Sequence, residues 1–220
     1  MSVFAVLVAA GRGERLGEDR PKAFVRLGEL PLLAEPLRRL DESELIDGVI
    51  VVAPAEWEDP AILLAEELGA SKVSSCVTGG QTRTESVRAG VAEVPDDATV
   101  ILVHDAARPL LPAEIVPRLL AALAQGYDGA VPGLPVRDTV KRVVGDTVAE
   151  TPARDELVTV QTPQAFVAAV LRAALARGEE GTDCASLVES GGGRVTVVEG
   201  DERLLKVTTR EDLERIAAWL

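Results

Sequence analysis

The stretch VFAVLVAAGRGERLGEDRPK, Val3 to Lys22, joins an apolar run to a loop rich in glycine and basic residues. The six apolar residues Val3 to Val8 predict a strand buried on both faces of a sheet. A loop after such a strand lies at the carboxyl edge, where open α/β sheets bind ligands. Gly11 and Gly13 allow the backbone to approach a phosphate closely. Positive charge would come from Arg12, Arg15, Arg20 and Lys22. We therefore predict an anion-binding loop, with a plain solvated loop as the alternative.

Two well-known phosphate motifs do not fit this loop. A P-loop needs a lysine directly after its second glycine and a serine or threonine next, whereas Lys22 lies well beyond Gly17 and precedes Ala23. A dinucleotide fingerprint needs a third glycine where Leu16 stands, and an acidic residue at the end of the second strand, where the chain has Ala53 and a proline. The loop therefore favours another kind of phosphate chemistry.

The rest of the chain alternates short Val/Ile/Leu runs with longer stretches of helical periodicity. This pattern is typical of βαβ units around a buried, largely parallel sheet. Strands are predicted at 3–8, 48–53, 72–77, 99–103, 129–132, 157–161, 194–199 and 205–207. Helices are predicted at 31–41, 59–68, 82–92, 112–124, 163–177, 182–190 and 210–220. We predict an α/β fold, a Rossmann-like three-layer sandwich with a mostly parallel mixed sheet.

The segment Val136 to Thr151 breaks this rhythm. It alternates β-branched and polar residues around Gly145 and Asp146, which predicts a two-stranded hairpin. Such a hairpin is not stable alone. We expect a single domain, 1–220, from which a β-arm insertion at about 136–153 projects to pack on a partner subunit.

The composition limits the possible partners. The chain has 220 residues, 47% of them hydrophobic, and a formal net charge of −13. This charge disfavours nucleic acid and anionic membrane surfaces, so an anion site must be a local basic cluster. Because there is no long apolar segment and no signal-peptide pattern, we expect a cytoplasmic protein. Cys76 and Cys184 are too few for a disulfide framework and lack a metal-binding spacing.

Four motifs occur in the order of one enzyme family. They are AAGRGERLGEDRPK at Ala9 to Lys22, LVHDAARP from Leu102, PVRDTVKR from Pro135 and TPQAF from Thr162. Together they resemble the 2-C-methyl-D-erythritol 4-phosphate cytidylyltransferases, within the sugar nucleotidyltransferases. The resemblance implies transfer of a cytidylyl group from CTP to a polyol phosphate in isoprenoid biosynthesis. It also implies Mg²⁺ or another divalent cation, and a homodimer joined through the β-arm.

The resemblance implies three sets of site residues. Catalysis falls to Arg15, Lys22 and Lys206. CTP binding falls to Ala9, Ala10, Gly11, Gly13, Arg15, Lys22, Gly79, Gly80, Ser86, Asp105 and Ala106. Acceptor binding falls to Asp105, Arg108, Thr139, Arg154, Thr162, Thr182 and Lys206, with Asp183 as the alternative to Thr182 near the sugar hydroxyls.

Asp105 is also the candidate metal ligand, because a carboxylate at a strand end is a hard oxygen donor suited to Mg²⁺. Capping of the next turn is the alternative role. The run Arg203 to Lys206 lacks the acidic residue usual in the family, so either Asp201 or Glu202 replaces it, or Asp105 is the only protein ligand. His104 is not expected to act as a base, because a phosphate acceptor is already largely ionised near neutral pH.

Other functions remain open at this level. The nearest is a cytidylyltransferase for another polyol phosphate, such as ribitol 5-phosphate. A non-catalytic nucleotide-sensing module belongs to a different class, and a nicotinamide-dependent dehydrogenase is the most distant. Retention of Arg15, Lys22 and Asp105 disfavours simple nucleotide sensing, because nucleotide binding alone does not require all three.

Overall fold

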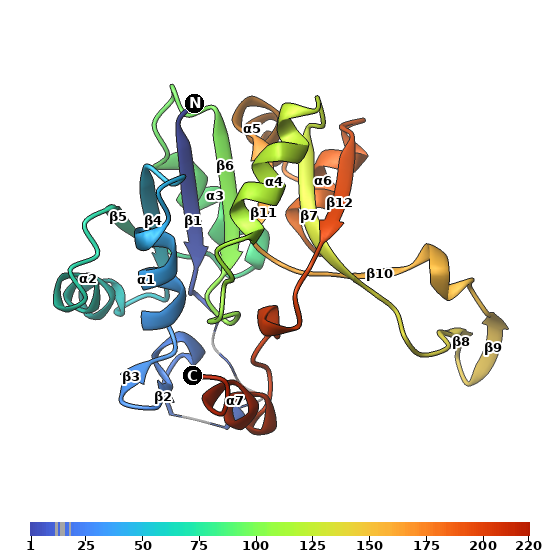
Figure 1. The fold of residues 1–220 in the computed structure, drawn as a ribbon, viewed down its shortest axis with the longest axis horizontal. Coiled ribbons are helices and arrows are strands. Elements are labelled where there is room, and N and C mark those ends of the chain that lie inside the picture. The colour runs from blue at the N-terminus through green and yellow to red at the C-terminus, as the bar shows by residue number, and fades with distance from the viewer. Residues whose placement is uncertain (12, 14–15, 18) are drawn as a thin grey trace.

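The computed structural model describes residues 1–11, 13, 16–17 and 19–220, and its frame is a mixed β-sheet (Figure 1). The strands are β1 (Val3–Val8), β4 (Gly48–Ala53), β5 (Val73–Thr78), β6 (Val100–Asp105), β7 (Gly129–Pro135), β10 (Val158–Val160), β11 (Gln164–Val167) and β12 (Val195–Glu199). They are ordered β10-β7-β11-β6-β1-β4-β5, and β12 also pairs with β7. β6, β1, β4 and β5 are parallel, whereas β11 runs antiparallel to β6 and β7. The predicted mostly parallel mixed sheet is confirmed.

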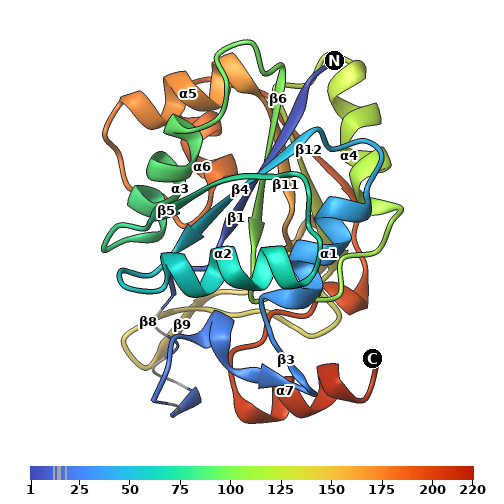
Figure 2. The same cartoon turned by 90° about the vertical axis from the view of Figure 1, so that its left-hand side faces the viewer.

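Helices cover both faces of this sheet (Figure 2). One face packs on α1 (Ala34–Glu42), α2 (Glu58–Glu67) and α4 (Ile115–Ala124). The other packs on α3 (Arg83–Ala92), α5 (Ala168–Ala176) and α6 (Cys184–Ser190). Ala5 and Leu7 of β1 belong to the first cluster and Val6 to the second, as the alternation of side chains along a strand requires. Each fully buried Leu or Val stabilises the fold by about 1.5–3 kcal/mol.

A smaller apolar cluster lies beyond the carboxyl ends of β1 and β6, which Figure 1 shows directed toward α7 (Arg210–Ala217). It packs α7 against Leu27 of β2 (Arg26–Leu27) and against Leu32, next to β3 (Leu30–Pro31), in the segment that follows η2 (Lys22–Phe24). Its buried members are Leu16, Leu27, Leu32, Leu110, Val207 and Ile216. This cluster holds the chain on both sides of Lys206 at the edge of the sheet, whereas Ala23, next to Lys22, is buried in the first cluster.

Several predicted elements differ from the structure in their bounds or their kind; α4, for example, begins at Ile115 instead of Pro112. The first helix begins at Ala34 instead of Pro31, because Leu30–Pro31 pairs with Arg26–Leu27. The strand predicted at 205–207 is wrong: after η4 (Glu202–Leu204) the chain is irregular, and the N–H of Val207 bonds only to the loop after β6, at the Ala107 carbonyl.

The helix predicted at 163–177 is wrong in its first part, where Gln164–Val167 forms β11. This strand fills the place between β6 and β7, and Phe166 is completely buried there. Gly129 on β7 makes room for it, since a Cβ at Gly129 would lie 2.7 Å from the Phe166 ring. Helix α5 then starts at Ala168.

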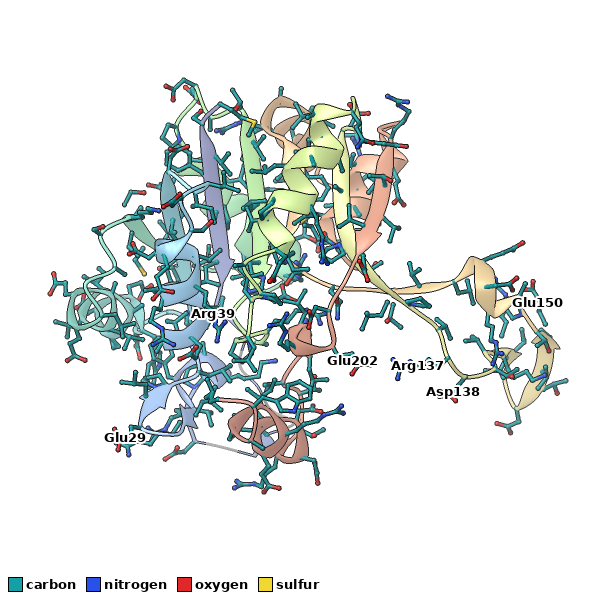
Figure 3. The ribbon with its side chains drawn as sticks, viewed as in Figure 1. Glu29, Arg39, Arg137, Asp138, Glu150 and Glu202 are labelled. Atoms are coloured by element: carbon teal, nitrogen blue, oxygen red, sulfur yellow. The ribbon has the colours of Figure 1, made fainter. Side chains whose placement is uncertain are left out.

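The predicted hairpin is present as β8 (Arg142–Val144) and β9 (Thr147–Glu150), joined at Gly145 with φ of 58°. It projects far from the sheet, together with the short helix η3 (Arg154–Glu156) (Figure 1). Near the base of the arm, Arg137 faces Glu202 of η4 with an Nη2 to Oε1 distance of 2.6 Å (Figure 3). In the described part of the chain, no helix is long and apolar enough to cross a membrane.

Candidate functional site

A pocket of about 670 Å³ lies at the carboxyl edge of the sheet. The loops after β1, β4, β5 and β6 form its walls, since these four strands are neighbours. Most of the residues predicted to bind CTP line it, namely Ala9, Ala10, Gly11, Lys22, Gly79, Gly80, Ser86, Asp105 and Ala106. Lys206 enters the same pocket from the chain before α7. Arg15, which was assigned a catalytic role, lies outside the described residues.

A second pocket of about 290 Å³ adjoins the first. It is lined by the predicted acceptor residues Arg108, Thr162, Thr182, Asp183 and Lys206. Arg83, Asp105 and Lys206 line both pockets and therefore form the wall that the pockets share. Thr139 and Arg154, also predicted to bind the acceptor, do not line this pocket: both are exposed on the arm, where Arg154 donates to the Arg137 carbonyl.

Asp105 is held between two cations in the shared wall. Its Oδ1 accepts from Arg83 at 2.9 Å and its Oδ2 accepts from Lys206 at 2.6 Å, while its side chain is only 10% exposed. Burial disfavours the charged carboxylate, but Arg83 and Lys206 hold the pKa of Asp105 well below its ordinary 3.8. Asp105 is consequently ionised at neutral pH, and it compensates a cluster of positive charge.

Behind Asp105, buried hydrogen bonds run in one consistent direction. The Asp105 N–H donates to Thr162 Oγ1 at 3.0 Å, and Thr162 lies 3.1 Å from His104 Nδ1. His104 Nε2 donates to the Arg108 carbonyl at 3.1 Å, which leaves Nδ1 to accept from the Thr162 hydroxyl. Burial lowers the pKa of His104 to about 4, so the ring is neutral at pH 7. His104 therefore helps to position the backbone of Asp105, through Thr162, and of Arg108 from the core.

The lysine of the glycine-rich loop is positioned by the backbone. Lys22 Nζ donates to the Val207 carbonyl at 3.1 Å, next to Lys206 in the chain. Gly13 has φ of 72° and lies so close that a Cβ there would approach the Lys22 Cβ to 2.5 Å. Gly13 does not line the pocket itself, and its role is to let the loop lie directly against Lys22.

The loop after β5 is rigid for local reasons. Thr82 caps α3 in a capping box with Glu85. Ser86 Oγ accepts from the Gly80 N–H at 3.1 Å and donates to the Thr82 carbonyl at 2.9 Å. Gly79 lies against the first loop, since a Cβ at Gly79 would lie 2.3 Å from the Ala10 Cβ. Both glycines line the pocket, and their N–H groups are engaged by the Ala53 carbonyl and by Ser86 Oγ.

Arg83 and Trp57 line the larger pocket but were not predicted from the sequence. Arg83 stands in the stretch that follows Gly79 and Gly80, but nothing in the sequence shows that it reaches Asp105 across the pocket. Its Nη1 also donates to Cys184 Sγ at 3.6 Å. Burial raises the pKa of the Cys184 thiol to about 11. Trp57, in the loop after β4, lines the larger pocket as well.

The substitutes proposed for a second acidic metal ligand are engaged elsewhere. Asp201 accepts from the Arg203 side chain at 2.8 Å, and Glu202 pairs with Arg137. Asp105 is the only carboxylate among the described residues that line the larger pocket. In that part of the chain, no three His, Cys, Asp or Glu side chains are grouped so as to hold a metal ion.

Comparisons with known proteins agree on one family. A family model described as "IspD: 2-C-methyl-D-erythritol 4-phosphate cytidylyltransferase" matches residues 3–220. The 2-C-methyl-D-erythritol 4-phosphate cytidylyltransferase of Nocardia farcinica is 47% identical over 220 residues, which cover 100% of this chain and 94% of that protein. That of Rhodococcus jostii is 46% identical, with 96% of this chain and 92% of the relative covered.

Solved structures of the same description share the fold. The 4-diphosphocytidyl-2C-methyl-D-erythritol synthase of Anaerococcus prevotii superposes with a TM-score of 0.86 at 27% identity, covering 99% of this chain and 97% of that one. The 2-C-methyl-D-erythritol 4-phosphate cytidylyltransferase of Thermus thermophilus gives a TM-score of 0.79 at 33% identity, covering 100% and 98% of the two chains.

Proposed function

The chain belongs to the 2-C-methyl-D-erythritol 4-phosphate cytidylyltransferase family, and on this premise we propose that it transfers the cytidylyl group of CTP to 2-C-methyl-D-erythritol 4-phosphate. The products are 4-diphosphocytidyl-2-C-methyl-D-erythritol and pyrophosphate, and the reaction serves isoprenoid biosynthesis. The observation that carries this proposal is the pair of adjoining pockets with Arg83, Asp105 and Lys206 in common. Two phosphorylated substrates seated in them would meet at that wall.

The chemistry is an in-line displacement at phosphorus. An oxygen of the acceptor phosphate attacks the α-phosphorus of CTP, the new P–O bond forms, and the bond from the α-phosphorus to the bridging oxygen of pyrophosphate breaks. The acceptor phosphate is ionised, so no base has to remove a proton. The protein must align the two phosphates and neutralise the negative charge that they bring together. The neutralising positive charge comes from Lys22, Arg83, Arg108 and Lys206. The family pattern assigns Arg15 to the same role.

The reaction further requires Mg²⁺ or another divalent cation in this proposal. Such an ion would supply further positive charge to neutralise the phosphates. Asp105 suits it as the protein ligand, because Oδ2 keeps a second lone pair beside its bond to Lys206, whereas Oδ1 accepts two bonds from Arg83. Mg²⁺ commonly takes one or two carboxylates and completes its shell with phosphate and water, so a single carboxylate is adequate.

The arm fits a homodimer, in which Thr139 and Arg154 complete the partner's acceptor pocket. Val143, Val144 and Val148 support this role, because they expose 53–72% of their surface on the arm and an isolated hairpin needs a packing partner. The proposed site of action is the cytoplasm.

The direct test is pyrophosphate release by the purified protein from CTP, 2-C-methyl-D-erythritol 4-phosphate and Mg²⁺. Ribitol 5-phosphate in a parallel reaction distinguishes the second acceptor, and we expect a strong preference for methylerythritol phosphate. Lys22→Ala should reduce turnover by roughly 100-fold or more, the usual loss when one charge-stabilising donor is removed from a reacting centre. No release by the wild type, or full activity of Lys22→Ala, would contradict the proposal.

A further inference from the structure

Trp57 lines the larger pocket from the loop after β4. It follows β4, and β4 lies between β1 and β5 in the sheet. The loop that carries Trp57 is therefore flanked by the glycine-rich loop on one side and by Gly79 and Gly80 on the other. Among the described residues that line this pocket, Trp57 is the only aromatic side chain.

The backbone holds Trp57 on both sides. Its N–H donates to the Pro54 carbonyl at 3.0 Å, closing a turn, and its carbonyl accepts from the Ala61 N–H at 3.1 Å in the first turn of α2. Within the turn, Glu56 has φ of 69° and is the only non-glycine residue of the described chain in that region. Such a conformation costs about 1–3 kcal/mol and persists only where the surroundings enforce it.

The indole also packs against the segment that carries Lys22. Its ring lies 4.5 Å from the ring of Phe24, centroid to centroid, with the planes tilted by 41°. Phe24 is only 6% exposed, so this contact is fixed, whereas Trp57 remains partly exposed where it lines the pocket. One side of the indole thus has a protein neighbour, and the pocket is open to a ligand.

The pocket is divided by polarity. The Arg83 side chain meets Asp105 and Lys206 beside β6, and Lys22 lies in the loop after β1, whereas Pro54, Ala55 and the two glycines of the next loop follow β4 and β5. A nucleoside triphosphate has the same division, with a charged tail and a flat, uncharged base. Its phosphates belong with the cations, which leaves the base at the end where Trp57 stands.

We infer that Trp57 contacts the base of the nucleotide and contributes to nucleotide affinity. Resting on the proposed function, this inference adds a binding residue to the CTP pocket. Aromatic side chains stack on bases of any kind, because every base has a π face. Trp57 therefore acts on affinity for the base more than on the choice between bases, which falls to the backbone edges of Gly79 and Gly80.

The chain offers a matched control, because its only other tryptophan is Trp219. Trp219 lies just after α7, stacked with Arg215 at 4.9 Å, and lines neither pocket. In Trp219→Phe, Trp57 is the sole tryptophan, and in Trp57→Phe only Trp219 remains. We expect CTP to change the fluorescence of Trp219→Phe saturably and to leave that of Trp57→Phe unchanged. Tripolyphosphate, which has the charged tail but no base, should leave both unchanged.

Kinetics provide the second measurement. Trp57→Leu keeps an apolar side chain without the ring, and should raise KM for CTP by roughly 5- to 30-fold, the loss of one base–aromatic stack. KM for the acceptor should stay within about twofold, and Trp57→Phe should lie between wild type and Trp57→Leu. Circular dichroism confirms folding, and if Trp57→Leu does not fold, the fluorescence of the two phenylalanine variants decides.

The inference is overturned if calorimetry shows CTP bound to Trp219→Phe without a fluorescence change, or if tripolyphosphate reproduces that change. An unaltered KM for CTP in folded Trp57→Leu overturns it as well. Failure of the proposed function looks different: the wild type then releases no pyrophosphate, while fluorescence and calorimetry still report whether the base lies against Trp57.

Discussion

Replacement of Asp105 by asparagine tests the electrostatic logic of the shared wall. The substitution preserves shape but leaves Arg83 and Lys206 facing each other without a negative charge. Removing one partner of a buried pair costs roughly 3–5 kcal/mol, and the lower end applies because the Arg83 and Lys206 side chains are 24% and 40% exposed. We expect a loss of about 3 kcal/mol in the free energy of unfolding at pH 7, which lowers Tm by about 6–12 °C in a chain of this size.

The same reasoning fixes a pH dependence. The folded pKa of Asp105 lies below its ordinary 3.8, so its ionisation stabilises the fold fully above that value and the stabilisation is lost as pH falls toward the folded pKa. The difference between wild type and Asp105→Asn should therefore be constant from pH 7 to pH 5. Below about pH 4 it should narrow by roughly 1.4 kcal/mol per pH unit, the free energy of one pKa unit.

Urea unfolding of both proteins at pH 7, 5, 4 and 3.5 measures this difference directly. Asp96→Asn is the control, since Asp96 is an exposed turn residue and its replacement should change stability by less than about 0.5 kcal/mol. A difference at pH 3.5 as large as that at pH 7, or a loss at pH 7 no larger than that of the control, would refute the role given to the Arg83–Asp105–Lys206 cluster.

Three further outcomes are expected. Gly79→Ala should lower the free energy of unfolding in urea by about 1–3 kcal/mol and raise KM for CTP, because its Cβ would lie 2.3 Å from the Ala10 Cβ. Gly11→Ala is the control and should leave stability unchanged, because a Cβ there meets nothing within 4 Å. Equal stability losses in the two variants would contradict this packing. Inactive Lys22→Ala and inactive Arg154→Ala chains, dissociated, mixed and reassembled, should recover about a quarter of the wild-type activity. Half of the randomly formed dimers are then hybrids, and each hybrid has one intact site of two. No restored activity would argue against a shared acceptor pocket. Chelation by EDTA should abolish pyrophosphate release and leave Tm unchanged, because Asp105 keeps its two cationic partners, and activity that survives EDTA would remove the divalent cation from the mechanism.

The sheet was largely predictable because its central strands are buried on both faces. Val3–Val8 and Gly48–Ala53 are continuous apolar runs, and both strands match the predicted bounds. The strand Gln164–Val167 was not predictable, because it runs directly into the helix-forming residues of α5 and no polar boundary separates the two. Its strand conformation depends on the backbone hydrogen-bonding groups of β6 and β7, which belong to distant parts of the chain.

The candidate site was also predictable only in part. Loops at the ends of neighbouring parallel strands meet at one edge whatever their separation in sequence, so the residues predicted after β1, β5 and β6 do share one pocket. What the motifs could not predict is which side chains cross it. Arg83 lies 22 residues from Asp105, and Lys206 lies 101 residues from it, so their pairing depends on where α3 and the chain before α7 come to lie.

This pairing explains how a strongly acidic protein keeps a basic pocket ready for its substrates. Without Asp105, the cations of Arg83, Arg108 and Lys206 would face one another across a partly dry wall, and their repulsion would push the side chains apart into solvent. Asp105 holds two of them in place, within hydrogen-bond distance, before any phosphate arrives. An incoming phosphate can then bind the donors that Asp105 leaves unused, since a guanidinium has five N–H groups and an ammonium three. The single carboxylate thus preorganises the positive charge for the phosphates, and in the proposed reaction its Oδ2 would also hold the cation.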